Sequence, residues 1–228
     1  MRLEEMNWMD VETYLKTDDR LMLVVGACEQ HGYLSLMTDV KIPAALADEA
    51  SRRTGVAVAP PLNFGISPYF TTYPGTMTLR TQTFLAVIQD LVRGVYAQGF
   101  HRLLFLNGHG GNDPARAVLR ELANELPDLR LGWYSWWIAP SVTEVAAAAD
   151  LRSAHAAWIE AFPFCRVRDL PPGEKQPVNS AGIRNAVQER ALAGDGVYGG
   201  PYVADDELMQ HIFDTAVGDI IEQLKFGS

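Results

Sequence analysis

Cysteine, long apolar runs and surplus positive charge are all scarce in this chain. Only Cys28 and Cys165 occur, and their spacing fits neither a disulfide framework nor a thiolate metal cluster, which favours a reducing compartment. No apolar run approaches the roughly 18 residues that a membrane-spanning helix needs. The acidic, amphipathic N-terminus is also unlike a signal peptide. We therefore expect a soluble, cytoplasmic protein that does not contact membranes.

The charge balance is negative, with 19 Lys and Arg against 28 Asp and Glu and a net charge of −9. A negative surplus repels polyanions and argues against nucleic acid as the main partner. Hydrophobic residues make up 48% of the chain and charged residues 21%, which is typical of a globular protein. The length of 228 residues is enough for a substantial core, and we expect one domain over residues 1–228.

Apolar runs and helical patterns alternate along most of the chain. This alternation is typical of an α/β protein in which a mainly parallel sheet lies between layers of helices. Continuous apolar runs predict buried strands at residues 21–27, 56–60, 102–106 and 129–137. Apolar positions spaced by three and four predict helices at residues 40–53, 81–98, 114–126, 142–162, 180–192 and 205–225. The proline-rich residues 163–177 are predicted to form a loop.

Metal-capable side chains directly follow two of the predicted strands. Glu29 and His31 come after the first strand, and His109 comes after the strand at residues 102–106. In a parallel sheet both segments lie at the carboxyl edge, where ligands bind in open α/β folds. Glu29 and His31 are two residues apart and therefore project from the same face of an extended chain. This mixture of carboxylate and imidazole predicts a site for Zn, Mn or Fe rather than for Ca or Mg.

Two nearby residues and one glycine-rich loop each allow two interpretations. Asp39 follows eight residues after His31 and could bridge two ions or cap the helix that begins there. The glycines around His109 could let the backbone approach a ligand or cradle a phosphate on their amides, although the segment lacks the Lys-Ser/Thr ending of a P-loop. Cys28 is interpreted as a buried thiol, with a catalytic nucleophile as the alternative.

A third group of chemically capable residues lies in the predicted helix at residues 142–162. Glu160 follows five residues after His155, so in a regular helix the two side chains point about 140° apart. Only a helix start or a kink would direct both at one site, and a solvent-facing glutamate is the alternative. Trp136 and Trp137 end the fourth strand and could line a pocket or pack in the core.

Taken together, the motifs resemble the creatininase family of amidohydrolases. The matching segments appear in the family's order: Glu29-Gln30-His31-Gly32, Thr38-Asp39, Tyr73-Pro74-Gly75-Thr76, Asn107-Gly108-His109-Gly110-Gly111-Asn112, His155 to Glu160, and Gly196 to Pro201. The resemblance implies a creatininase-like layered fold with two divalent ions in each subunit. It also implies a homo-oligomer, with a hexamer common in the family.

The resemblance also implies roles for individual residues. Those matching Glu29, Asp39 and His109 would hold one ion, and those matching His31 and Asp39 would hold the second, with Glu160 as the candidate for its remaining carboxylate. His155 and Glu160 are the catalytic candidates, and His155 is expected to titrate near neutrality and protonate the leaving nitrogen. The candidates for substrate contact are Tyr73, Gly75, Thr76, Gly110, Trp136 and Trp137.

The expected activity is cleavage of a C–N bond in a small cyclic amide, lactam or formamide by metal-activated water. Short peptides are another substrate class that the family serves. The sequence also allows two other functions. One is a non-catalytic metal-binding or assembly protein with a decayed site, because residues 33–37 form a shorter loop than in the family. The other is a nucleotide-binding α/β protein.

Overall fold

Four parallel strands form the centre of the computed structural model, which describes residues 1–179 and 181–227. They are β1 (Arg20–Val25), β2 (Ala57–Val58), β3 (Arg102–Asn107) and β4 (Arg130–Ser135). Their order in the sheet is β2-β1-β3-β4. All but the first residue of β1 and of β3 are buried, because these central strands are covered on both faces, and a continuous apolar run is suited to such a position.

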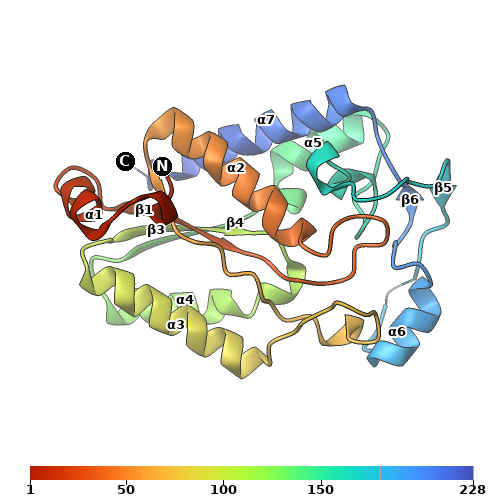
Figure 1. The fold of residues 1–228 in the computed structure, drawn as a ribbon, viewed down its shortest axis with the longest axis horizontal. Coiled ribbons are helices and arrows are strands. Elements are labelled where there is room, and N and C mark those ends of the chain that lie inside the picture. Colours follow the sequence, from red (N-terminus) through yellow and green to blue (C-terminus); the bar gives the residue numbers. More distant parts are fainter. Residues whose placement is uncertain (180, 228) are drawn as a thin grey trace.

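Helices cover both faces of the sheet (Figure 1). One face carries α2 (Thr38–Thr54), α5 (Pro140–Ala148) and α7 (Asp206–Gln223), and the other carries α3 (Thr81–Ala97) and α4 (Ala115–Glu125). Successive strand residues alternate between the two cores, so that Met22 and Leu104 pack on the first side while Leu21 and Leu103 pack on the second. The predicted layered α/β fold is confirmed.

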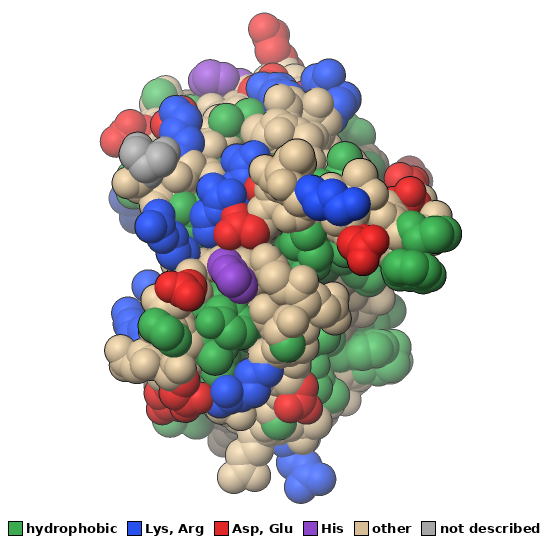
Figure 2. Space-filling view, turned by 90° about the vertical axis from the view of Figure 1, so that its left-hand side faces the viewer, with side chains coloured by type: hydrophobic (Ala, Val, Ile, Leu, Met, Phe, Trp, Pro, Cys, Tyr) green, Lys and Arg blue, Asp and Glu red, His purple; other side chains and the backbone are tan. Residues whose placement is uncertain are grey.

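The strand register makes the central strands end at one level. Val25 of β1 pairs with Asn107 of β3, which pairs in turn with Ser135 of β4. The loops that follow these strands therefore leave the sheet together. The opposite end of the molecule carries α1 (Trp8–Leu15) and both chain termini (Figure 1). On that end, acidic and basic side chains intermingle (Figure 2).

The helix predicted over residues 142–162 is wrong beyond Ala148, where α5 ends. Residues 149–157 are irregular, and Ala156 adopts a left-handed φ of 58°. A 3-10 turn at Trp158–Glu160 follows. The alanine-rich composition favours a helix, but Trp158 is fully buried against the sheet, and this packing overrides the local preference.

Two further differences concern the C-terminal third. Helix α6 (Ala186–Ala193) is shorter than the predicted helix at residues 180–192, because Asn185 caps it in a reciprocal capping box with Gln188. Ser180, the predicted start, lies outside the described residues. The predicted loop at residues 163–177 contains β5 (Glu174–Lys175), which pairs antiparallel with β6 (Gly200–Pro201).

Among the described residues, no helix combines the length and apolar composition that crossing a membrane requires.

The core under α3 provides a test of this packing. Ile88 is fully buried, whereas Leu91 on the same helix is 41% exposed. We expect Ile88→Ala to lower the free energy of unfolding by about 2–5 kcal/mol because it leaves a cavity. Leu91→Ala should change it by about 0.5 kcal/mol or less. Urea denaturation of both variants measures the difference, and equal losses would contradict the described orientation of α3.

Candidate metal centre

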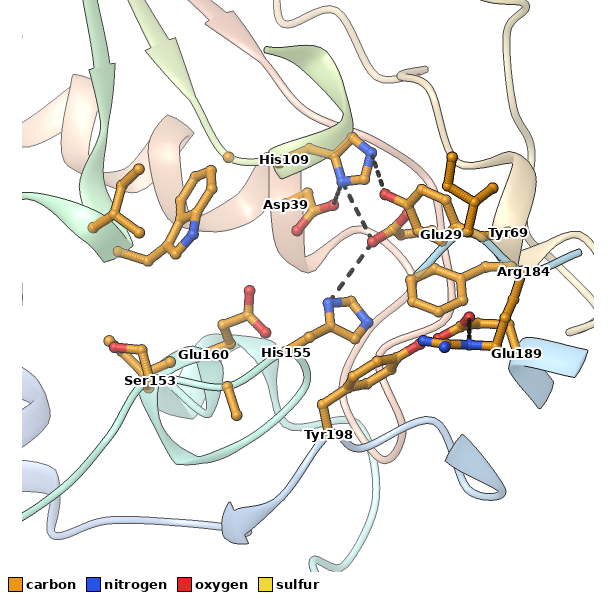
Figure 3. Close-up of a pocket in the computed structure, with 18 of the residues that line it drawn as sticks. Glu29, Asp39, Tyr69, His109, Ser153, His155, Glu160, Arg184, Glu189 and Tyr198 are labelled. Carbon is orange, nitrogen blue, oxygen red and sulfur yellow. Dashed lines mark hydrogen bonds and ion pairs between the residues drawn. The ribbon is translucent and has the colours of Figure 1, made fainter. Parts of the chain in front are cut away.

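Five acidic and imidazole side chains meet at the carboxyl end of the sheet. Glu29 and His31 follow β1, His109 follows β3, Asp39 lies in the first turn of α2, and Glu160 lies in the 3-10 turn after α5. All five are buried. Their ligand atoms form two groups within 4.8 Å of one another, Glu29–Asp39–His109 and His31–Asp39–Glu160, and a third group of the same kind joins Glu29 and His31 to His155. Figure 3 shows Glu29, Asp39 and His109 facing one another, with Glu160 across the cavity.

Asp39 is the residue that the first two groups share. Its Oδ1 lies 2.9 Å from Nε2 of His31, and its Oδ2 lies 3.0 Å from Nδ1 of His109. Nδ1 of His109 is also 3.4 Å from Oε1 of Glu29, and Nε2 of His31 is 3.8 Å from Oε1 of Glu160. Asp39 does not cap α2, because Met37 occupies the cap position without any side-chain bond. Its two oxygens therefore face different imidazoles, one in each group.

Backbone carbonyl groups determine which ring nitrogens carry hydrogen. Nδ1 of His31 lies 3.2 Å from the carbonyl oxygen of Glu29, and Nε2 of His109 lies 2.9 Å from that of Ile66. A carbonyl oxygen can only accept, so these nitrogens are the donors. The other nitrogens, Nε2 of His31 and Nδ1 of His109, then face the carboxylates. This arrangement of a carbonyl behind each imidazole is typical of metal-binding histidines.

Three buried polar atoms at this centre make no hydrogen bond with the described part of the chain, although an oppositely charged group lies 2.9 Å from one of them and 3.0 Å from another. They are Oε2 of Glu29, Nε2 of His31 and Oδ2 of Asp39. Leaving such atoms unsatisfied is costly in a folded protein. Because the donor set of carboxylates and imidazoles suits divalent transition metals, cations bound between these residues would satisfy all three atoms. The residues present therefore fit a metal centre.

The local charge also favours cations. Burial works against a charged imidazole, but the carboxylates of Asp39 and Glu160 raise the pKa of His31 well above its ordinary value. Those of Glu29 and Asp39 do the same for the pKa of His109. The negative field that holds a proton on these nitrogens would equally hold a metal ion in its place.

The glycine at 108 allows the loop after β3 to pack directly on α2. A Cβ at Gly108 would lie 1.9 Å from the carbonyl oxygen of Asp39, so no larger residue fits without displacing Asp39. The Gly108 amide donates to the carbonyl oxygen of Val25, and the His109 amide donates to Oδ1 of Asn107. With these two amides already used, the loop is poorly suited to cradle a phosphate.

His155, which joins Glu29 and His31 in the third group, is 23% exposed and is the most accessible of these side chains. Gln30 accepts from the Gly32 amide and donates to the Gly196 carbonyl, which fixes the orientation of its side-chain amide. Its Nε2 lies 2.9 Å from Nε2 of His155, and the backbone carbonyl oxygen of Gln30 lies 3.2 Å from the same ring nitrogen, so Gln30 positions the imidazole through two contacts. In the metal-free protein, burial and the positive charge of His31 lower the pKa of His155 to about 4, below the near-neutral value that was expected.

A cavity of about 590 Å³ opens above the centre. Gly110 and Trp137, both predicted to contact substrate, line it together with Glu29, Asp39, His109, His155 and Glu160. The volume lies in the range of sites that hold drug-sized ligands. The cavity has room for more than a single small ring.

The other four residues predicted to contact substrate do not line this cavity. Trp136 is 1% exposed and packs in the core against Phe162. The 3-10 turn after β4 directs Trp136 into the core and Trp137 towards the cavity. Thr76 accepts a hydrogen bond from the Gln30 amide, and the Tyr73 hydroxyl donates to the Gly194 carbonyl. The turn at Tyr73 to Thr76 thus supports the loop of the metal centre.

Several residues that line the cavity had not been predicted. Tyr69, Arg184, Glu189 and Tyr198 are the polar ones with interactions of their own. Tyr198 stands in the glycine-rich segment that matches the family, so the motif could have indicated it. Arg184 and Glu189 belong to no motif, and only the packing of residues 181–198 against the centre reveals them.

A comparison with known proteins adds an independent finding. The sequence model of the creatinine amidohydrolase (creatininase) family matches residues 4–224. The chain belongs to the creatininase family. It is 32% identical over 146 residues to creatinine amidohydrolase of Pseudomonas putida, in a match that covers 58% of this chain and only 56% of that protein. It is 35% identical over 223 residues to mycofactocin precursor peptide peptidase of Mycolicibacterium smegmatis, which covers 90% of this chain and 84% of the peptidase.

Solved structures of creatininases share the fold. A crystal structure of creatinine amidohydrolase superimposes with a TM-score of 0.79 at 23% identity, covering 98% of this chain and 96% of the other. Further creatininase structures with similar scores are described as a Zn-Zn form and as a manganese form. The family and the creatininase-like fold predicted from the motifs are therefore confirmed.

Removal of one histidine tests the geometry of the centre. We expect His109→Ala to lose bound divalent metal, because His109 is the sole imidazole of the Glu29–Asp39–His109 group. His211→Ala, which alters an exposed residue of α7, is the matched control and should keep it. Metal content per subunit, measured by mass spectrometry after gel filtration, distinguishes the two. Full occupancy in His109→Ala would contradict the grouping.

The metal-free and metal-loaded proteins should respond differently to pH. Without metal, His31 and His109 have raised pKa values in the folded state, so above about pH 6.5 the folded protein binds more protons than the unfolded chain does. The free energy of unfolding of the metal-free protein therefore falls as the pH rises above about 6.5. A metal ion needs the same nitrogens unprotonated, so metal binding becomes stronger as the pH rises. We expect the gap in Tm between the two forms to widen from about pH 6.5 to about 8.5. Scanning calorimetry at several pH values tests this, and a narrowing gap would contradict it.

Proposed function

We propose that this protein is a divalent-metal-dependent amidohydrolase that cleaves a C–N bond of a small cyclic amide, lactam or formamide. The observation that carries the proposal is the placement of Asp39 between His31 and His109, with Glu29 and Glu160 completing the two groups. A decayed, non-catalytic site is less well supported, because all five candidate ligands converge and a cavity reaches four of them, Glu29, Asp39, His109 and Glu160.

The residues that would hold the ions follow from the geometry. Glu29, Asp39 and His109 would bind one ion, and His31, Asp39 and Glu160 would bind the second. The donor set favours Zn, Mn or Fe, and the described Zn-Zn and manganese forms of other creatininases support this choice. When bound, such ions lower the pKa of water from 15.7 towards about 7 and polarise a substrate carbonyl.

Two groups of this chain are positioned to assist the reaction. With a pKa of about 4 in the metal-free protein, His155 is neutral at pH 7, so its unprotonated ring nitrogen could accept the proton that the attacking water loses and pass it to the departing nitrogen. Among the amides of residues 108–111, those of Gly108 and His109 are already bonded within the protein. The amide of Gly110, on the cavity wall, remains to stabilise negative charge that develops on the carbonyl oxygen.

A short peptide is the second candidate substrate. The cavity of about 590 Å³ exceeds the needs of a single small ring. The mycofactocin precursor peptide peptidase also aligns over 90% of this chain, whereas creatinine amidohydrolase aligns over 58%. The same centre would then cleave an acyclic amide bond, and the cavity walls would determine which substrates enter.

The catalytic step can be separated from metal binding by altering His155. We expect His155→Ala to keep its metal and to lower kcat by about 100- to 10,000-fold, because a positioned proton donor is removed. The measurement combines elemental analysis with turnover of a panel of lactams, formamides and short peptides. His211→Ala is the control and should match the wild type. Unchanged kcat in His155→Ala would rule out the assigned role.

Chelation tests the hydrolase proposal itself. Treatment with a chelator should abolish hydrolysis of whichever panel member the protein cleaves, and addition of the originally bound metal should restore it. Hydrolysis that survives complete removal of metal would contradict the proposal.

A further inference from the structure

Arg184 is held rigidly in the wall of the cavity. Its Nε donates to Oε2 of Glu189 at 2.9 Å, and its Nη1 donates to the carbonyl oxygen of Ala181. Glu189 is 7% exposed, and its other carboxylate oxygen accepts the hydroxyl of Tyr198. These contacts orient the guanidinium before any ligand binds, which lowers the entropy lost on binding.

The guanidinium keeps donors available on its outer edge. Nη2 of Arg184 makes no hydrogen bond with the described residues, and Nη1 has a second hydrogen. An arginine that serves only to neutralise a carboxylate commonly pairs with it through two parallel bonds. Here Glu189 takes only Nε, so the edge formed by the two terminal nitrogens is left to pair with a planar carboxylate.

Arg184 is also the only Lys or Arg among the described residues that line the cavity, which otherwise contains four carboxylates. Three of these carboxylates, Glu29, Asp39 and Glu160, belong to the candidate metal centre, and the fourth is Glu189. With ions bound, the centre no longer repels an anionic ligand, and Arg184 provides a specific partner for its negative group.

The position of Arg184 sets the shape of such a ligand. The ring of Tyr198 meets the ring of His155 edge-on at 5.4 Å, and Tyr198 in turn contacts Glu189, the partner of Arg184. Figure 3 shows Arg184 and Glu189 on the side of His155 away from Glu160. A ligand that reaches both the metal centre and Arg184 therefore extends along Tyr198.

We infer that Arg184 determines specificity by binding a carboxylate of the substrate, so that the enzyme prefers amides that carry a carboxylate apart from the scissile C–N bond. This inference rests on the proposed hydrolase function and narrows its substrate class. A neutral ring such as a simple lactam would leave the outer edge of Arg184 unused.

The test compares substrates that differ only in this charge. Metal-loaded protein is given a library of acetylated tripeptides with free C-terminal carboxylates and the same library as C-terminal amides, and hydrolysis is followed by mass spectrometry. Binding of acetyl-trialanine and of its amide is measured in parallel by saturation-transfer NMR. We expect kcat/KM, or affinity, to favour the acids by about 10- to 150-fold in the wild type, as for one charge-assisted contact.

Variants identify the residue responsible. Arg184→Gln should reduce the acid-to-amide ratio to about 1, whereas Arg120→Gln, which removes the same charge from an exposed position on α4, should leave the ratio unchanged. The double variant Arg184→Gln, Glu189→Gln removes the unpaired charge of Glu189. If Arg184 acted only by neutralising Glu189, the double variant would regain the wild-type acid-to-amide ratio. If Arg184 binds the carboxylate of the substrate, the ratio stays at about 1 in the double variant.

The outcomes separate this inference from the proposed function. Equal treatment of acids and amides by the wild type, or an acid preference that persists in Arg184→Gln, would overturn the inference, and cleavage of either library would still support the hydrolase proposal. An Arg184-dependent preference in binding without any hydrolysis would uphold carboxylate recognition and count against the hydrolase proposal.

Discussion

The structure of the centre depends on one buried carboxylate that is shared between two imidazoles. Asp39 has almost no contact with solvent and faces His31 on one side and His109 on the other. A carboxylate in this position is stable only with compensating positive charge. The fold creates the position by ending β1 and β3 at one level and by seating the start of α2 on Gly108, where no side chain would fit.

The fold and the candidate ligands could be predicted because both depend on local patterns. Buried parallel strands are continuous apolar runs, and chemistry-bearing residues directly after them must meet at one edge. Glu160 and His155 could not be placed in this way. Their segment has the composition of a helix, and only burial of Trp158 against the sheet produces the turn that brings Glu160 to His31.

The cavity walls were the least predictable part. Trp136 and Trp137 are adjacent in sequence, yet the turn after β4 places one in the core and the other at the cavity. Arg184 is held by contacts with residues of its own C-terminal segment and belongs to no motif. Family members that share the centre but differ in these walls could act on different amides, which agrees with relatives named as a creatinine amidohydrolase and as a peptide peptidase.

The most direct test of the central claim is anomalous X-ray diffraction from crystals of the purified protein at the absorption edge of its bound metal. The account predicts one peak between Glu29, Asp39 and His109 and a second between His31, Asp39 and Glu160. Anomalous peaks only elsewhere in the molecule would contradict it. So would crystals of an amide-hydrolysing preparation in which these side chains bond to one another and no ion lies between them.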